Sequence, residues 1–240
     1  MLLSRFYTKA KLDLLLGVLS IICIWLMLSA SSDPILPWLK GTPVAAAFEQ
    51  FSTGNQVTID LSVGVLSAIG MFYLLVRLPE YERKNRIKGH LKFSYQSFKR
   101  SVIQIFVGAI QGSYDTETVD RLMEQREFRD FFKQPYVSGQ NKWHGVANKM
   151  SDFMLRQLVL EAEVLLNEFQ HTLSVVDIRD PEVYAFMKRL SVALYRAKNW
   201  SVDYDGTKEV LGFFWEILSG WNFIDGYADS EYIPAMIAKL

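Results

Sequence analysis

The sequence predicts an all-α protein, in which a membrane-embedded hairpin of two helices precedes a cytosolic helical domain. Two runs without a charged residue, at positions 14–30 and 61–76, are mostly apolar. As helices they would cover most of a hydrocarbon core about 30 Å thick. Beyond them, apolar side chains recur at steps of three and four residues, the spacing of one helix face. No alternating pattern indicates a β-strand.

The two expected transmembrane helices cover about residues 12–31 and 58–78, so that residues 1–78 form the membrane segment. The first run also follows three basic residues and ends in small residues. That is the pattern of a cleavable signal peptide, which stays an alternative. The second run close behind it favours a retained hairpin.

The distribution of Lys and Arg predicts the orientation of this hairpin. Residues 1–13 carry three basic residues, and residues 77–100 carry eight against two acids, whereas the connection at 31–60 carries one Lys. Basic residues close to a span stay in the cytoplasm. We therefore expect an inner (plasma) membrane protein of bacterial type with both termini cytoplasmic.

The charge of the whole chain is balanced but unevenly spread. Residues 1–112 hold 12 Lys and Arg against 6 Asp and Glu, and residues 113–240 hold 14 against 20. A basic first half suits an anionic lipid surface, and an acidic second half disfavours broad nucleic-acid binding. The single cysteine, Cys23, allows neither an intramolecular disulfide nor a zinc site of cysteines.

Residues 79–112 read as a basic, amphipathic juxtamembrane helix. Its cations are expected to contact lipid headgroups or another polyanion: Arg83, Lys84, Arg86, Lys88, Lys92, Lys99 and Arg100. Its apolar face is expected to pack: Leu91, Tyr95, Phe98, Val102, Ile105 and Ala109. Stacking of Tyr95 and Phe98 on a nucleic acid is the alternative, but both rings lie on the apolar face, which favours burial.

A pair of small residues on the second span, Gly64 and Ala68, predicts close helix packing. The partner is either the first span, which is the simpler interpretation, or a second copy of the chain.

Residues 113–240 are expected to form the cytosolic domain. The pattern predicts helices at about 115–134, 146–173, 181–199 and 208–220, with Asp180 and Pro181 as a strong start signal for the third. Aromatic residues are dense from position 200 onward, and either a core or a partner surface accounts for them.

Three possible chemical motifs are incomplete. Glu168 and His171 match a di-iron helix motif that must occur twice, and it occurs once. The acidic turn at 203–206 lacks the final Glu of a calcium loop. Arg86 and His90 are closer together than the Arg/His pair of helical ribonucleases. We therefore expect no catalytic residue, no metal and no cofactor, and a protein that is not an enzyme.

The hairpin, the segment Leu-Pro-Glu-Tyr-Glu-Arg-Lys at 78–84 and the helix from 91 to 105 resemble the two-span membrane effectors of bacterial anti-phage defence systems, including those of retrons. The resemblance covers about residues 12–110. It implies a non-enzymatic effector that oligomerises or perturbs the inner membrane when a partner senses infection.

Two other functions stay open. The chain could be a membrane-tethered scaffold that recruits a soluble protein or a nucleoprotein, or a membrane-associated hydrolase without a recognisable motif. The expected partners are membrane lipids, further copies of the chain or another protein at the cytosolic domain, with nucleic acid bound only indirectly.

Overall fold

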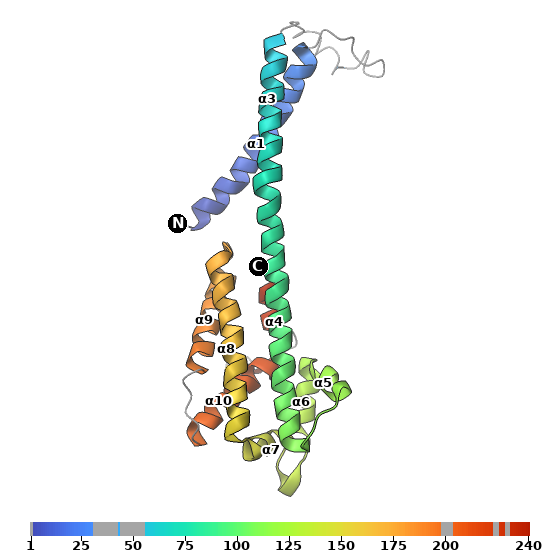
Figure 1. Ribbon diagram of the computed structural model, residues 1–240, viewed down its shortest axis with the longest axis vertical. Coiled ribbons are helices and arrows are strands. Elements are labelled where there is room, and N and C mark those ends of the chain that lie inside the picture. Colours follow the sequence, from blue (N-terminus) through green and yellow to red (C-terminus); the bar gives the residue numbers. More distant parts are fainter. Residues whose placement is uncertain (1, 31–42, 44–55, 198–203, 223–225, 229–230) are drawn as a thin grey trace. The chain divides into compact units, whose positions relative to one another are not determined.

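The computed structural model describes residues 2–30, 43, 56–197, 204–222, 226–228 and 231–240. These residues are mainly helical, which confirms the predicted all-α class (Figure 1). The described part of the chain also contains a small antiparallel ladder that pairs β1 (Trp221–Asn222) with β2 (Gly226–Tyr227), and an isolated antiparallel bridge between Pro135 and Asn141. The chain divides into two compact units, which we call the N-terminal unit (residues 1–83) and the C-terminal unit (residues 84–240).

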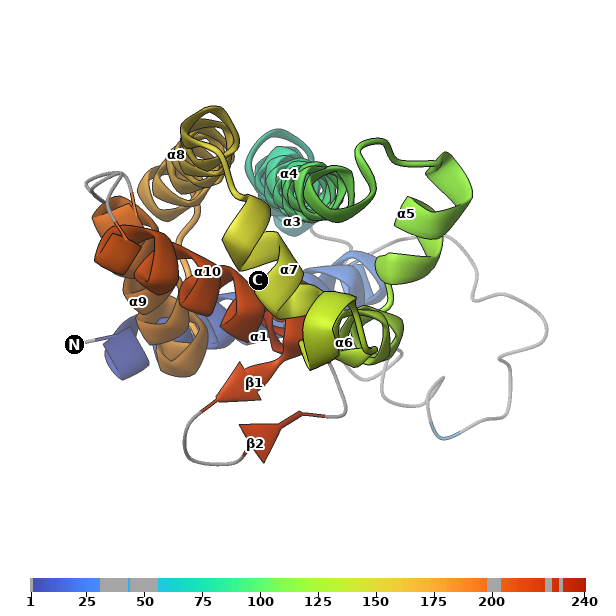
Figure 2. The ribbon, with the colours of Figure 1, turned by 90° about the horizontal axis from the view of Figure 1, so that it is seen from below.

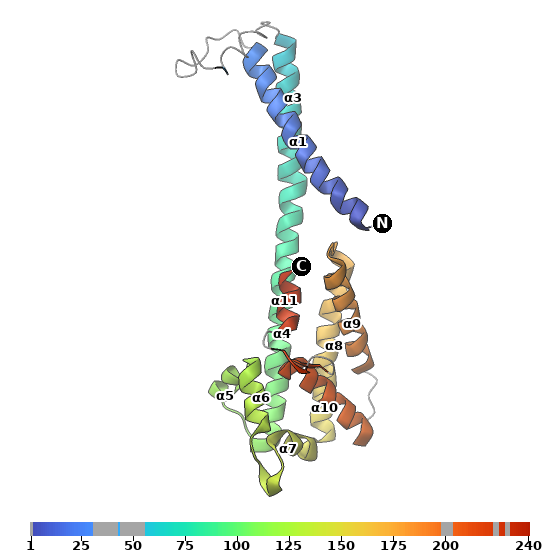
Figure 3. The same ribbon diagram turned by 180° about the vertical axis from the view of Figure 1, so that it is seen from behind.

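The N-terminal unit is built from α1 (Leu2–Ala30) and the antiparallel α3 (Gln56–Phe72), which pack against each other (Figures 1 and 3). The part of α1 at Lys11–Ala30 and the longer helix that begins with α3, Gln56–Gln111, are long and apolar enough to cross a membrane. Only 11% and 6% of the residues in their most apolar stretches are buried, whereas the core helix of a soluble protein would be mostly buried. Most of the expected polar connection, at 31–42 and 44–55, lies outside the described residues.

The face of α3 that is buried differs from the expected one. Ser62 and Ile69 are buried, whereas Gly64 and Ala68 are exposed. The prediction that Gly64 and Ala68 pack on the first span therefore needs correction. The buried residues of the hairpin include Ser62 and Ile69 on α3 and the small Cys23 on α1. Packing of Gly64 and Ala68 on a second copy stays a prediction.

The second span does not end where the sequence suggested. A π-helix, η1 (Tyr73–Arg77), joins α3 to α4 (Leu78–Gln111), so that one helix runs from Gln56 to Gln111. The backbone N–H of Leu78 bonds to the carbonyl of Tyr73, five residues back. Pro79 has no N–H to give and would clash with a carbonyl in a regular α-helix. The π-turn just before it accommodates the proline without ending the helix.

The C-terminal unit gathers short and long helices around the later part of α4 (Figure 2). In chain order these are α5 (Thr116–Leu122), α6 (Gln125–Lys133), the 3₁₀ turn η2 (Val137–Gly139), α7 (Lys142–Lys149), α8 (Asp152–Val175), α9 (Pro181–Ala197), α10 (Tyr204–Ser219) and α11 (Tyr232–Ala238). Helix α8 packs on α9, while α6, α7 and α10 pack on one another.

Two helices that were expected to be continuous are each broken. The segment 115–134 divides into α5 and α6, because the apolar spacing jumps by five residues from Met123 to Phe128 and cannot stay on one face. The segment 146–173 divides into α7 and α8 at Ser151, whose hydroxyl accepts a hydrogen bond from the N–H of Met154. This N-cap begins a new helix.

The predicted start of α9 is confirmed, since the carboxylate of Asp180 accepts hydrogen bonds from the N–H groups of Glu182 and Val183, at 2.8 and 3.4 Å. The last predicted helix begins at Tyr204, earlier than expected, and α11 was not predicted.

An aromatic cluster forms the centre of the C-terminal unit. The ring of Phe106 lies edge-to-face with Phe132, Trp143 and Phe214, at centroid distances of 6.2, 5.1 and 6.1 Å. Each such pair stabilises the core by about 0.5–1.5 kcal/mol beyond its area burial. The rings come from α4, α6, α7 and α10, so this cluster fixes helices that are distant in sequence.

Candidate functional site

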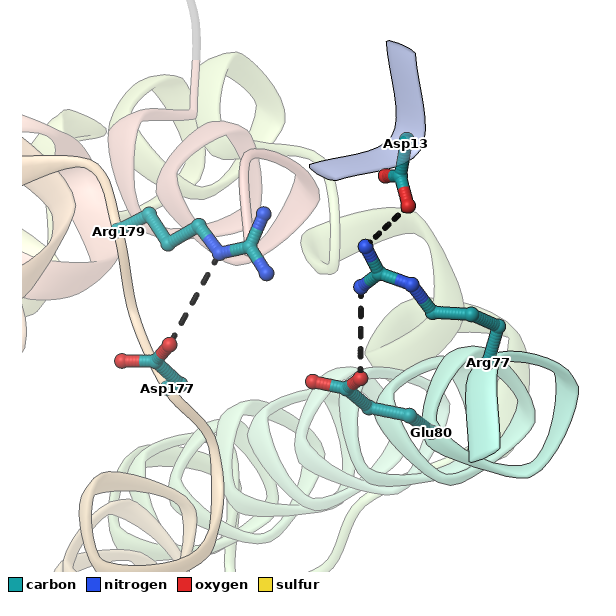
Figure 4. Close-up of polar contacts among 5 residues, drawn as sticks. All are labelled: Asp13, Arg77, Glu80, Asp177 and Arg179. Atoms are coloured by element: carbon teal, nitrogen blue, oxygen red, sulfur yellow. Dashed lines mark hydrogen bonds and ion pairs between the residues drawn. The ribbon is translucent and has the colours of Figure 1, made fainter. Parts of the chain in front are cut away.

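A bridging arginine joins the two helices of the N-terminal unit. The guanidinium of Arg77 donates to the carboxylate of Asp13 on α1, and its other terminal nitrogen lies 3.7 Å from Glu80 (Figure 4). Arg77 is largely buried, while both acids are partly exposed. One planar cation thus pairs with two carboxylates at the end of the apolar run of α3, which fixes the register of the hairpin.

The seven cations expected at a lipid surface do not share one environment. Arg83, Arg86 and Lys92 are exposed, and Lys84 is partly buried. Arg100 contacts Asp120 of α5 at 2.5 Å. Lys99 is buried, with 3% of its side chain exposed, and pairs with Glu231. The prediction that Lys99 contacts lipid is therefore corrected, because a buried ammonium with a carboxylate partner cannot reach a headgroup.

Lys88 and Lys99 both bind the short helix α11, and we call them the lysine clamp. The ammonium of Lys88 donates to the backbone carbonyl of Ala238 at the C-terminal end of α11. Lys99 donates to Glu231, the residue just before α11. Figure 3 shows α11 alongside α4. A cation at the C-terminal end of a helix is favoured by the helix dipole, so the two lysines bind α11 at both of its ends.

The apolar face of α4 lies in the core of the C-terminal unit. Leu91, Tyr95, Phe98 and Val102 are buried, and Ile105 is partly buried against the core. A second row on the same helix, which was not predicted, is buried as well: Ile103, Phe106, Val107 and Ile110. Burial, with a smaller contribution from the charge of Glu231, raises the pKa of Tyr95, so its hydroxyl stays neutral.

Two members of different incomplete motifs, His90 and Glu168, contact each other. His90 lies 3.0 Å from Glu168, so the acid of the di-iron motif pairs with a histidine of α4. Asp177 and Arg179, also drawn in Figure 4, form a pair at 3.9 Å within the loop before α9. The described part of the chain contains no group of three His, Cys, Asp or Glu that could hold a metal ion. Position 203 of the acidic turn lies outside the described residues.

A cavity of about 820 Å³ lies beside the lysine clamp in the C-terminal unit. Lys99 and Glu231 line it together with side chains from α9 and α10. This cavity was not predicted, because Lys99 and Glu231 are 132 positions apart and nothing in their local patterns pairs them.

Comparison of the chain with protein-family models, with curated proteins and with solved structures finds no match.

Proposed function

We propose that this protein is a non-enzymatic effector of the inner membrane, anchored by the hairpin of α1 and α3. In this proposal residues 84–240 form a cytosolic regulatory domain. That domain responds to a partner, and the hairpin then oligomerises or perturbs the bilayer, as in anti-phage defence. The observation that carries the proposal is the exposed apolar surface of the hairpin.

Many large apolar residues of the hairpin are exposed, which is unusual for a protein in water. Leu14, Ile21 and Leu74 expose 70%, 69% and 61% of their residue surface, and many of their apolar neighbours are exposed as well. Monomeric soluble proteins rarely expose contiguous apolar patches of more than a few hundred Å². A hydrocarbon environment, or further copies of the hairpin within it, accounts for such a surface.

The charged residues support one orientation of the hairpin. The Asp13–Arg77 pair marks one end of the apolar surface, and the exposed cations Arg83, Arg86 and Lys92 follow it on α4. Cations in this position attract anionic headgroups by about 1 kcal/mol each. They favour a cytoplasmic location for residues 84–240 and for both termini.

The continuous helix supports an effector over a passive scaffold. The same helix carries the apolar residues of the second span and the core residues Tyr95, Phe98 and Phe106. A change in the packing of the regulatory domain therefore acts on a helix that enters the membrane. A passive scaffold would need only a membrane anchor, and not a helix that the span shares with the regulatory domain.

Two measurements on the full chain test the proposal. After expression in bacteria, the protein is expected to resist extraction from membranes by alkaline carbonate, and a protein released by carbonate would refute the anchor. A potential-sensitive dye is expected to report depolarisation when the protein is triggered, as during phage infection of cells that express it from its native locus. A chain that stays in the membrane of the infected cell without depolarising it would refute the effector and favour the scaffold.

Charge variants test the lipid contact separately. Substitution of Arg83, Arg86 and Lys92 by Gln is expected to weaken binding of the full chain to anionic vesicles with no change in thermal stability. The matched control removes three exposed cations elsewhere, Arg156, Lys188 and Arg196, and should leave binding nearly unchanged. Equal losses in both variants would show that only net charge matters.

A further inference from the structure

The cavity beside the lysine clamp has the size and the lining of a small-molecule site. Its volume of about 820 Å³ falls within the range of roughly 300–1,000 Å³ that is usual for ligand pockets. Most of its lining is apolar, and aromatic rings form part of the wall. Phe186 and Tyr232, for example, meet edge-to-face at a centroid distance of 5.1 Å. Such rings pack well on a flat apolar body.

The cavity also contains an unevenly buried ion pair. Lys99 is 3% exposed, whereas its partner Glu231 is 35% exposed. Removing an ammonium from water carries a large free-energy cost unless an opposite charge accompanies it. Lys99 therefore needs an anion at its side at all times, whereas Glu231 can turn to water at much lower cost.

This difference determines the charge of the ligand that fits. An entering anion could take the place of Glu231 on Lys99, which would leave the buried ammonium paired and the released carboxylate in contact with water. An entering cation would instead bind Glu231 and leave Lys99 buried without a partner. The desolvation penalty thus favours an anion and disfavours a cation.

We propose that this cavity binds a small organic anion, a carboxylate on a flat apolar body, with Lys99 as the anion-binding residue and Glu231 as the internal competitor. This site is separate from the membrane function proposed above and does not depend on it. The exposed Arg189 and Glu216 also line the cavity and carry opposite charges. The preference for an anion therefore comes from the buried ammonium of Lys99.

Calorimetric titration of the full chain in nanodiscs of neutral lipid tests the proposal. The probes are 3-phenylpropionate, the neutral 3-phenylpropanol and the cationic 3-phenylpropylamine, which share one body and differ in charge. We expect the carboxylate to bind at least tenfold more tightly than the alcohol or the amine. Equal affinities, tighter binding of the amine, or no carboxylate binding at millimolar concentration would overturn the proposal.

Two variants assign the residues. Glu231→Gln removes the competing charge and is expected to tighten carboxylate binding several-fold, whereas loss of affinity in this variant would contradict the proposal. Lys99→Met is expected to weaken binding at least tenfold, and the matched control Lys92→Met makes the same change at an exposed position of α4. If Lys99→Met does not fold, the ligand series and Glu231→Gln still decide the outcome.

Discussion

The ring of Phe98 stacks on the ring of Phe214, with centroids 5.8 Å apart and planes inclined by 27°. Both residues are almost fully buried, and they join α4 to α10. Phe98→Ala removes this contact and leaves a cavity, so we expect the free energy of unfolding of the C-terminal unit to fall by about 3–5 kcal/mol. Thermal melts of the full chain in nanodiscs, followed by circular dichroism, measure the change.

Phe93 provides the control for this prediction. It lies on the same helix with 68% of its surface exposed. Phe93→Ala should leave the melting temperature close to that of the parent. Similar melting of both variants would mean that Phe98 does not pack in the core.

The antiparallel pairing of α1 and α3 predicts a specific cross-link. Because Asp13 pairs with Arg77, a residue ten positions after Asp13 lies level with one ten positions before Arg77. Cys23 therefore lies opposite Ser67 along the axis of the hairpin, and Ile69 is the buried residue of α3 nearest to that position. Oxidation of the Ile69→Cys variant is expected to give an intramolecular disulfide with Cys23, seen as a mobility shift that reductant reverses.

Ala68→Cys is the matched control, because Ala68 neighbours Ile69 but lies on the exposed face. It should give no intramolecular product. An intramolecular disulfide from Ala68→Cys but not from Ile69→Cys would mean that the small residues do face the first span. A dimer from Ala68→Cys would instead support packing of the small pair on a second copy.

Glu161 on α8 gives a prediction about pH. Burial raises the pKa of its carboxyl, and a hydrogen bond from Ser101 offsets part of this effect. An acid with a raised pKa in the folded state stabilises the fold below its unfolded pKa, and this contribution is lost as the pH rises through the folded pKa. Glu161→Gln should therefore raise the melting temperature at neutral pH, with little gain at a pH of about 4. Glu216→Gln, the same change at an exposed acid of α10, is the matched control.

Ser219 at the end of α10 carries a buried hydroxyl that has no hydrogen-bond partner among the described residues. An unsatisfied buried hydroxyl costs about 1–3 kcal/mol. We expect Ser219→Ala to stabilise the C-terminal unit by about 1 kcal/mol in denaturant titration. Ser191→Ala is the control, because the buried hydroxyl of Ser191 donates to the carbonyl of Met187 at 2.8 Å. Loss of this hydrogen bond should lower the free energy of unfolding. Destabilisation by Ser219→Ala would indicate a hidden partner.

What the sequence predicted well depends on local signals. Each of these signals lies within a short stretch of the chain: the two apolar runs, the N-cap at Asp180, and the apolar row of Leu91, Tyr95 and Phe98. The helix through Pro79 was missed, because the π-turn that accommodates a proline has no clear residue signature. Helix α11 was missed for a related reason, since Pro234 lies in its first turn, where proline is tolerated but resembles a break.

The candidate site was less predictable, because its members meet only in the folded chain. Lys99 follows Phe98 directly, so the same turn of α4 buries both, and only a carboxylate from the distant Glu231 makes the burial of a lysine tolerable. Local charge density placed Lys99 with its exposed neighbours Lys92 and Arg86. The environment of a charge depends on tertiary pairing, which the spacing of residues along one helix does not encode.

The lysine clamp depends on the length of α11. Lys88 and Lys99 are eleven positions apart on α4, a rise of about 16 Å, while the seven residues of α11 span about 10 Å and the side chains of the clamp cover the difference. The spacing of the two lysines along α4 thus limits the lengths of α11 that both can bind. Removal of one turn, about 5 Å, from α11 would widen this difference to about 11 Å and leave only one of its two ends within reach of a lysine. The shortest α11 that both lysines can bind is therefore set by the distance between two residues more than a hundred positions earlier in the chain.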